Sequence, residues 1–144
     1  MSTPRQTVRL ASVPLRPRSF VFVPLENFSL HCFSSAVDCL RIPTRMADRE
    51  LYTWRLLAED GADVTSSAGI TFRVDGDLEA LTREDTVMIC GGLDVRKATT
   101  KRVLSWLRRE ARKGLAVGGL CTASYTMAAA GLLDGRRATI HWEN

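Results

Sequence analysis

Cys121 is the residue whose type and setting best suit chemistry. An apolar run over residues 115–117 leads into two glycines, the cysteine follows shortly after, and a helical pattern begins at once over 122–132. This arrangement predicts a strand, a sharp turn and a helix, with the thiol at the carboxyl end of the strand. Beside a helix N-terminus, the helix dipole and the unpaired N–H groups favour a thiolate or a bound anion. Cys121 is therefore a candidate nucleophile or a candidate pocket-lining thiol.

A cysteine nucleophile needs a general base, most often histidine, and a group that orients the base. The chain has His31 and His141 to offer. His31 stands at the start of the first predicted helix, whereas His141 follows the last predicted strand, within reach of the same sheet edge. Thr122, next to the thiol, cannot act as a base. The residue types therefore favour a pocket-lining role for Cys121, and an enzyme that uses Cys121 and His141 is the alternative.

Three segments of the predicted sheet end in small or turn-forming residues at the edge where the thiol lies. They are residues 24–28, 91–93 and 119–122. Two adjacent glycines after a buried strand, as at Gly91 and Gly92, let backbone N–H groups approach a ligand closely. Ligands of open α/β sheets bind beyond the carboxyl ends of the strands, where the strand order reverses. We therefore expect a binding site at this edge.

Strands and helices alternate along the chain. Apolar or alternating runs predict strands at 20–23, 51–58, 86–90, 115–117 and 136–141, with short extended stretches at 64–66 and 70–74. Helical spacing predicts one helix from Leu30 to a point before Pro43, capped by Asn27 or Ser29, and others over 99–113 and 122–132. This alternation predicts an α/β fold, a mainly parallel sheet with helices on both faces.

The length of 144 residues suits one domain. Residues 1–18 hold three prolines and scattered arginines without a sustained period, which predicts a flexible N-terminal arm. Residues 19–144 then make up the folded domain. Because no helix follows the last predicted strand to cover it, we expect this domain to be incomplete at its C-terminus.

The composition indicates a folded cytoplasmic protein. Hydrophobic residues make up 45% and charged residues 25% of the chain, which is typical of globular domains. No apolar run approaches the roughly 18 residues of a membrane span, and the arginine-bearing N-terminus lacks the apolar core of a signal peptide. The net charge of +4 is unevenly distributed, because residues 96–113 hold eight basic side chains and one acid, Glu110. We interpret this segment as a solvated helix face; nucleic-acid contact is the alternative.

The other cysteines do not indicate a metal centre. Cys32, Cys39 and Cys90 show no C-x-x-C spacing and no matching histidine pair, so neither a zinc site nor a disulfide framework is expected. Cys32 and Cys39 lie on one face of the first predicted helix, which is typical of small buried hydrophobic residues. No metal and no cofactor is predicted.

The residues that follow the strand-to-helix turn at Cys121 resemble a known protein family. The run 128–142, AAAGLLDGRRATIHW, is similar to the amidotransferase-like sensor domain of AraC-type transcription regulators. Segments 23–30, 35–37 and 52–61 agree with it, so that the resemblance covers about residues 19–144. The branch it resembles senses arginine, carnitine or glycine betaine.

This resemblance implies a flavodoxin-like fold of the class I glutamine amidotransferase and PfpI type. It also implies a homodimer that binds a small nitrogenous effector, while a C-terminal pair of helix-turn-helix motifs, not present in this chain, binds DNA.

Two departures from the PfpI-type enzymes weigh against catalysis. Those enzymes place a histidine directly after the nucleophilic cysteine, where this chain has Thr122, and a glutamate near the start of the first helix, where this chain has Cys32. Glu26 lies too early, in the loop. The resemblance thus implies a sensor without enzymatic activity; the alternative is a cysteine-dependent hydrolase or glyoxalase-like enzyme of the PfpI superfamily that uses Cys121 and His141.

We expect the effector to contact the backbone of the two turns, with aromatic or imidazole side chains as walls. A quaternary ammonium would be attracted to an aromatic wall by about 0.5–2 kcal/mol through cation–π contact. A carboxylate would be received by the helix N-terminus at Thr122. The predicted ligand-binding residues are Phe28, Gly91, Gly92, Leu93, Cys121, Thr122, His141 and Trp142.

Overall fold

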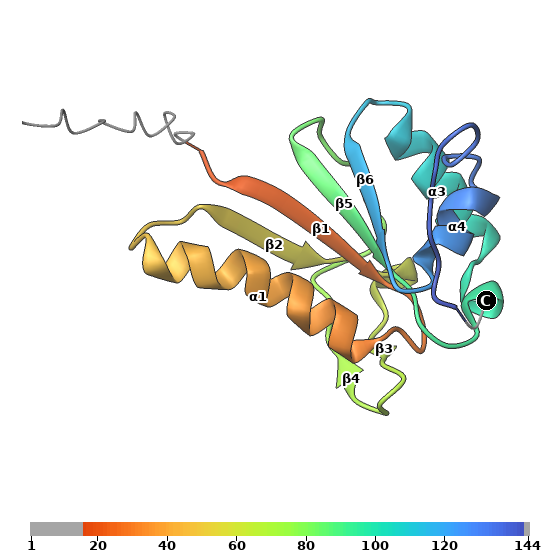
Figure 1. Ribbon diagram of the computed structural model, residues 1–144, viewed down its shortest axis with the longest axis horizontal. Helices are drawn as coiled ribbons and strands as arrows, with labels where there is room; N and C mark the ends of the chain where they lie inside the picture. The colour runs from red at the N-terminus through yellow and green to blue at the C-terminus, as the bar shows by residue number, and fades with distance from the viewer. Residues whose placement is uncertain (1–15, 143–144) are drawn as a thin grey trace, which may run out of the picture.

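Four parallel strands form the central sheet of the computed structural model, which describes residues 16–142 (Figure 1). The strands are β1 (Arg18–Pro24), β2 (Tyr52–Leu56), β5 (Asp85–Cys90) and β6 (Ala116–Leu120), in the spatial order β2-β1-β5-β6. All three pairings are parallel. The predicted α/β fold with a parallel sheet is confirmed. Most of the predicted arm over residues 1–18 lies outside the described residues, and β1 already begins at Arg18.

The strand order reverses between β1 and β5. From β1 the chain crosses to β2 on one side, and it then returns to β5 and β6 on the other side of β1. The connections that leave the carboxyl ends of β1 and β5 therefore diverge to opposite sides. In flavodoxin-like sheets this divergence opens a crevice that ligands occupy. The fold thus selects the loops after β1, β5 and β6 as the walls of a site.

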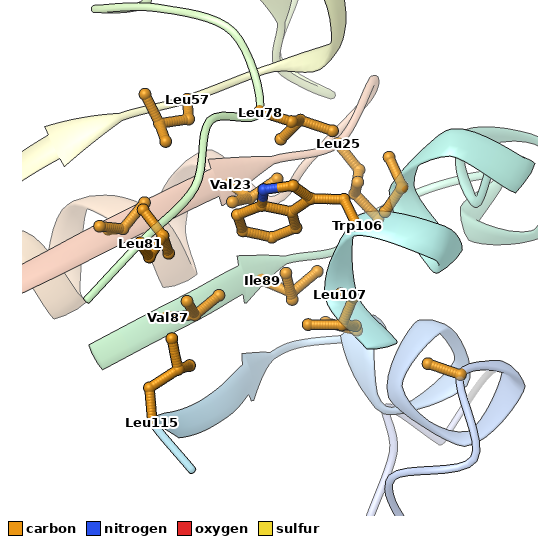
Figure 2. Close-up of a cluster of buried hydrophobic side chains, with 14 of the residues drawn as sticks. Val23, Leu25, Leu57, Leu78, Leu81, Val87, Ile89, Trp106, Leu107 and Leu115 are labelled. Carbon is orange, nitrogen blue, oxygen red and sulfur yellow. The ribbon is translucent and has the colours of Figure 1, made fainter. Parts of the chain in front are cut away.

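Helices cover both faces of the sheet. Helix α1 (Leu30–Met46) packs Phe33, Val37 and Leu40 against one face. On the other face lie α3 (Lys101–Ala111), α4 (Ala123–Ala129) and the short α2 (Val95–Ala98). Figure 2 shows Trp106 and Leu107 of α3 reaching towards strand side chains such as Ile89. None of the helices in residues 16–142 has the length and apolar character that crossing a bilayer requires.

Helix α1 runs through Pro43, although the sequence predicts an end before it. Ser29 caps its N-terminus by accepting a hydrogen bond from the Cys32 N–H at 3.4 Å, as one of the two predicted caps. Pro43 removes one helical N–H, whose acceptor would be the carbonyl of the exposed Cys39, where water can replace it. The Ala47 N–H still donates to the Pro43 carbonyl at 2.9 Å, so the helix closes normally at Met46.

Strand β6 continues through both of its glycines, which the sequence places in the turn. Gly118 pairs with Met88 and Gly119 with Ile89 of β5. A Cβ atom on Gly118 would lie 2.8 Å from the Met88 sulfur, and one on Gly119 would lie 2.9 Å from the Met127 sulfur. The glycines therefore serve close packing on the two faces of the strand, and the turn itself begins only at Cys121.

The predicted strand over 136–141 does not form. These residues follow α4 and a turn without strand structure, held by the Ser124 hydroxyl, which donates to the Thr139 carbonyl. An isolated alternating run becomes a strand only beside a partner, and residues 136–141 pair with no strand of the described chain. The predicted helices over 99–113 and 122–132 are shorter than expected, and β3 (Val64–Thr65) and β4 (Thr71–Phe72) form a separate antiparallel pair.

Glu110 is buried, although the sequence predicts a solvated face for the basic segment over residues 96–113. It is the acid within the basic segment of α3, and its side chain is 0% exposed. It accepts hydrogen bonds from the Leu81 N–H at 2.9 Å, from Arg109 at 2.7 Å and from Lys113 at 2.5 Å. Glu110 and Lys113, which bond the N–H and the carbonyl of Leu81, thus hold the loop before β5 against the end of α3.

Candidate functional site

Cys121 occupies a strained turn between β6 and α4. Its φ of +57° lies in the left-handed region, which residues with a Cβ adopt at a cost of about 1–2 kcal/mol. The surrounding backbone fixes this conformation, because the preceding Leu120 carbonyl accepts the Gly91 N–H at 3.2 Å. A strained non-glycine residue on a strand-to-helix turn presents its side chain outward, as in nucleophile elbows. Cys121 is half-buried at this turn.

The loop after β5 packs so closely against its neighbours that only glycines fit. A Cβ atom on Gly91 would lie 2.5 Å from the Ala123 nitrogen, and one on Gly92 would lie 2.0 Å from the Asn27 carbonyl oxygen. The Leu93 N–H donates to that same Asn27 carbonyl at 3.0 Å. The loops after β1, β5 and β6 are thereby fixed against one another at the carboxyl edge of the sheet.

A cavity of about 350 Å³ opens between these loops. Its lining residues are Ser29, Ser67, Gly92, Leu93, Asp94, Cys121, Thr122 and His141. Five of the residues predicted from the sequence thus meet at one cavity: Gly92, Leu93, Cys121, Thr122 and His141. The volume lies at the lower end of the range for small-molecule sites, about 300–1,000 Å³. A molecule of amino-acid size fits these dimensions.

The three other predicted binding residues lie elsewhere. Gly91 is buried behind the cavity, and Phe28 is 0% exposed, with its ring 5.5 Å from the rings of both Phe33 and Phe72. Phe28 therefore belongs to the aromatic core under the hairpin of β3 and β4. Trp142 is 82% exposed and lies beside His141 at a ring distance of 5.6 Å, outside the cavity lining. Neither Phe28 nor Trp142 forms the aromatic wall that the sequence predicts for a cation.

Sequence reasoning missed Ser29 as a lining residue, and it missed Ser67 and Asp94 entirely. Asp94 has a φ of +51° at the N-cap of α2, a conformation that Asp tolerates better than most residues, and its side chain makes no capping hydrogen bond there. Ser67 belongs to the hairpin between β3 and β4, and its N–H donates to the Phe28 carbonyl at 2.9 Å. No local signal places that hairpin beside β1.

The carboxylate of Asp94 gives the cavity lining a negative charge. Among the described lining residues Asp94 is the one acid, and no lysine or arginine accompanies it. Hydroxyl groups of Ser29, Ser67 and Thr122 supply the remaining side-chain hydrogen-bonding capacity. A cavity of this kind attracts a cationic group and can bond a second polar group of the same ligand.

The other three cysteines differ in their burial. Cys90 is 1% exposed, and burial, with a smaller contribution from Cys32, raises the pKa of its thiol far above the usual value. Cys90 therefore stays a neutral thiol in the core. Cys32 is half-buried, but Cys39 is exposed on α1, contrary to the predicted burial. Within residues 16–142 no cluster of three or more histidine, cysteine or acidic side chains is arranged to hold a metal ion.

Comparison with known proteins agrees with this architecture. The model of the DJ-1/PfpI family matches residues 34–144. The HTH-type transcriptional regulator CdhR of Pseudomonas aeruginosa is 42% identical over 126 residues, which are 88% of this chain and 37% of that protein. The chain spans about a third of the length of the curated regulators it matches. An enzyme, the isonitrile hydratase of Pseudomonas putida, is 34% identical over 88 residues, covering 60% of this chain and 39% of that protein.

A solved structure extends the agreement to three dimensions. The crystal structure of an AraC family transcriptional regulator from Pseudomonas putida superposes with a TM-score of 0.72 at 27% sequence identity, and the match covers 88% of this chain and 68% of that one. These matches confirm the resemblance to AraC-type regulators with a PfpI-type domain, and they confirm the flavodoxin-like fold.

Proposed function

This chain belongs to the DJ-1/PfpI family, and from that premise we propose that it is a non-catalytic effector-sensing domain of an AraC-type transcription regulator. The observation that carries the proposal is the cavity at the carboxyl edge of the sheet, where the loops after β1, β5 and β6 meet around Cys121. The effector is a small nitrogenous metabolite of the amino-acid or betaine class. Its binding adjusts the loops that surround it.

Asp94 supplies the charge that selects a nitrogenous cation. Its carboxylate lines the cavity in the absence of any described lysine or arginine, so an ammonium, guanidinium or quaternary ammonium group gains attraction there without competition. The hydroxyls of Ser29 and Ser67 lie on the same lining and can donate to the carboxylate end of an amino acid or betaine. A zwitterionic effector thus finds complementary groups within one cavity.

The surroundings of Cys121 support binding over catalysis. The neighbouring Thr122 offers no base, and its hydroxyl donates to the Gly92 carbonyl at 2.8 Å. Cys32 stands in the first turn of α1, where the related enzymes carry a glutamate, so an activating acid is missing from that position. We therefore assign Cys121 a ligand-contacting role.

The rest of the regulator lies outside this chain. A DNA-binding unit with helix-turn-helix motifs supplies the contact with DNA, and the sensing domain forms a homodimer in the cytoplasm. The relatives support this part of the proposal, since the chain spans about a third of their length and they are named as HTH-type regulators.

Calorimetric titration tests the proposal. Arginine, carnitine and glycine betaine are titrated into the protein, and we expect saturable binding of at least one of them. Asp94→Asn removes the charge with little change of shape and is expected to weaken that binding about tenfold, or about 1.4 kcal/mol. Asp134→Asn, an exposed acid outside the cavity lining, is the matched control and leaves affinity unchanged. Absence of binding by all three compounds contradicts the proposal.

An enzyme is the second candidate, and one observation favours it. Cys121, His141 and Asp94 line the same cavity, and these are the residue types of a nucleophile, a base and a group that orients the base. A cysteine-dependent hydrolase or glyoxalase-like activity would use them in those roles. Titration of the thiol with iodoacetamide separates the two candidates. A Cys121 pKa well below the reference of about 8.5, together with a turnover that Cys121→Ala abolishes, would establish the enzyme.

A further inference from the structure

A second cavity opens at the carboxyl edge of the sheet, between the ends of β1 and β2 and the start of α3. It has a volume of about 240 Å³, and its lining comes from β1, the loops after β1 and β2, α2 and α3. It shares no lining residue with the effector cavity. Because small-molecule sites usually measure about 300–1,000 Å³, this smaller cavity suits a single side chain better than a whole metabolite.

This second cavity has an apolar floor and an acidic rim. The buried apolar residues of its lining are Val23, Leu25, Ala58, Val64 and Val103. The charged residues of its lining are Glu26, Glu59, Asp63 and Lys97. Three carboxylates and one ammonium group give the lining a net charge of −2. The cavity therefore attracts a positively charged group.

The three carboxylates of the rim take part in none of the ion pairs found within residues 16–142. Glu59 accepts a hydrogen bond from the Thr100 hydroxyl at 2.7 Å, and Glu26 accepts one from the Thr65 N–H at 3.3 Å. These neutral donors position the two carboxylates without neutralising them. An arginine side chain matches such a cavity, because its methylene stem packs on apolar surface while its guanidinium group pairs with carboxylates.

Residues 1–15, which lie outside the described part of the chain, carry arginines within reach of this cavity. They include Arg5 and Arg9 and no acid. The fold begins at Arg18, the first residue of β1, and the cavity lies at the other end of this strand, at Pro24. Six residues of strand span about 20 Å. The nine residues from Arg9 to Arg18 span up to about 30 Å, so that Arg9 reaches the cavity with length to spare.

We propose that residues 1–15 dock on their own domain, with the Arg9 side chain in the cavity between β1, β2 and α3. Its stem lies on the apolar floor, and its guanidinium group pairs with the carboxylates of the rim. Arg9 is favoured over Arg5 because it closes the shorter loop, at a lower cost in chain entropy. The segment of the same chain is favoured over that of a second copy, because a short linker gives an effective concentration in the millimolar range.

Backbone order in residues 1–15 tests this docking. Nitrogen-15 relaxation of the full 144-residue chain gives the order parameters of the Val8 and Leu10 amides. We expect values above about 0.6 in the parent protein and below about 0.6 in Arg9→Gln, because a docked backbone is ordered and a released one is not. Arg16→Gln is the matched control. Its backbone lies within about 7 Å of the start of β1 and cannot reach the cavity, so the order of Val8 and Leu10 stays unchanged.

Variants of the rim identify the docking site. Glu26→Gln with Asp63→Asn neutralises two exposed carboxylates at nearly constant size and is expected to cause the same loss of order. Glu84→Gln with Asp134→Asn, two exposed acids outside this lining, is the control and leaves the order unchanged. Low order in the parent protein, or order that survives in Arg9→Gln or in the rim variant, would overturn the proposal. Order that rises with protein concentration would overturn it too, since a second copy would then supply the segment.

Discussion

The Thr122 hydroxyl donates a hydrogen bond to the Gly92 carbonyl at 2.8 Å and so joins the loop after β5 to the elbow after β6. Thr122 is 2% exposed, and the two residues come from different crossovers of the fold. Because both line the same cavity, the bond fixes the relative position of two cavity walls. Together with the hydrogen bond from the Gly91 N–H to the Leu120 carbonyl, it joins the two loops.

Removal of this bond is expected to destabilise the protein and to loosen the cavity. Thr122→Val keeps the shape of the side chain but removes the donor to the half-buried Gly92 carbonyl, which costs about 0.5–1.5 kcal/mol. Urea denaturation followed by circular dichroism measures the loss. Thr139→Val, at an exposed position, is the control and stays within about 0.5 kcal/mol of the parent protein. An unchanged midpoint for Thr122→Val would show that the bond contributes nothing.

Close packing of the loop after β5 predicts that Gly92 cannot be replaced. In Gly92→Ala the added Cβ would meet the Asn27 carbonyl oxygen at 2.0 Å, so the loops must move apart, at a cost of about 3 kcal/mol. In Gly76→Ala the added Cβ meets only the end of the Leu57 side chain, at an ordinary 3.6 Å. Thermal denaturation of the two variants compares the positions. The clash is refuted if both glycines tolerate alanine equally well.

The left-handed conformation of Cys121 predicts that glycine destabilises the protein less than alanine at this position. In most positions alanine is more stabilising than glycine, but at a φ of +57° glycine avoids the steric cost of a Cβ. Cys121→Gly is therefore expected to be more stable than Cys121→Ala by about 1 kcal/mol. In the exposed Ala128 of α4 the usual order should hold, with Ala128→Gly losing about 1 kcal/mol. Chemical denaturation of the three variants decides the point; a more stable Cys121→Ala would show that the elbow is unstrained.

Glu110 is expected to make stability depend on acid pH. Burial acts to raise its pKa, but the hydrogen bonds from Lys113, the Leu81 N–H and Arg109 outweigh this effect and hold the pKa below the ordinary value of 4.5. The unfolded state therefore binds a proton first as the pH falls. The stabilisation by Glu110 is present above pH 4.5 and is lost as the pH drops from there through the lowered folded-state pKa.

The variant Glu110→Gln tests this dependence. At neutral pH it is expected to lower the free energy of unfolding by about 2 kcal/mol, because hydrogen bonds to a charged group are lost. Below pH 4.5 the difference from the parent protein narrows, since the Glu110 carboxyl is protonated first in the unfolded state and then, as the pH passes the lowered pKa, in the folded protein. Urea denaturation from pH 7 to pH 3 measures both curves, with Glu84→Gln at an exposed position as the control. A difference that stays constant over this range would contradict the assigned role of the charge.

Much of the fold follows from local patterns, and the wrong predictions of secondary structure have long-range causes. The alternation of apolar runs and helical spacing correctly predicts that there is a parallel sheet, a helix N-cap at Ser29 and a turn at Cys121. The sequence predicts a turn at the glycines of β6, because their tight contacts with Met88 and Met127 cannot be read from neighbouring residues. The run 136–141 alternates like a strand, yet strand formation needs a partner that sequence periodicity does not specify.

The residues of the candidate site also fall into two groups, those that local patterns predict and those that only the tertiary structure reveals. Gly92, Leu93 and Cys121 follow strands directly, so the sequence places them at the carboxyl edge, where they line the cavity. Ser67 comes to that cavity through a hairpin with no signal of its destination, and Phe28 turns inward to an aromatic core instead of facing a ligand. The part played by the lining residues in binding stays a prediction.

By itself the sequence determined the α/β class, the family and a thiol held at a strand-to-helix elbow, because these depend on periodicity and on short contiguous motifs. Only the tertiary structure decided that Asp94 lines the cavity and that Glu110 is buried within a basic helix. Each of these depends on which distant segments meet, and that is set by strand order and register across the sheet.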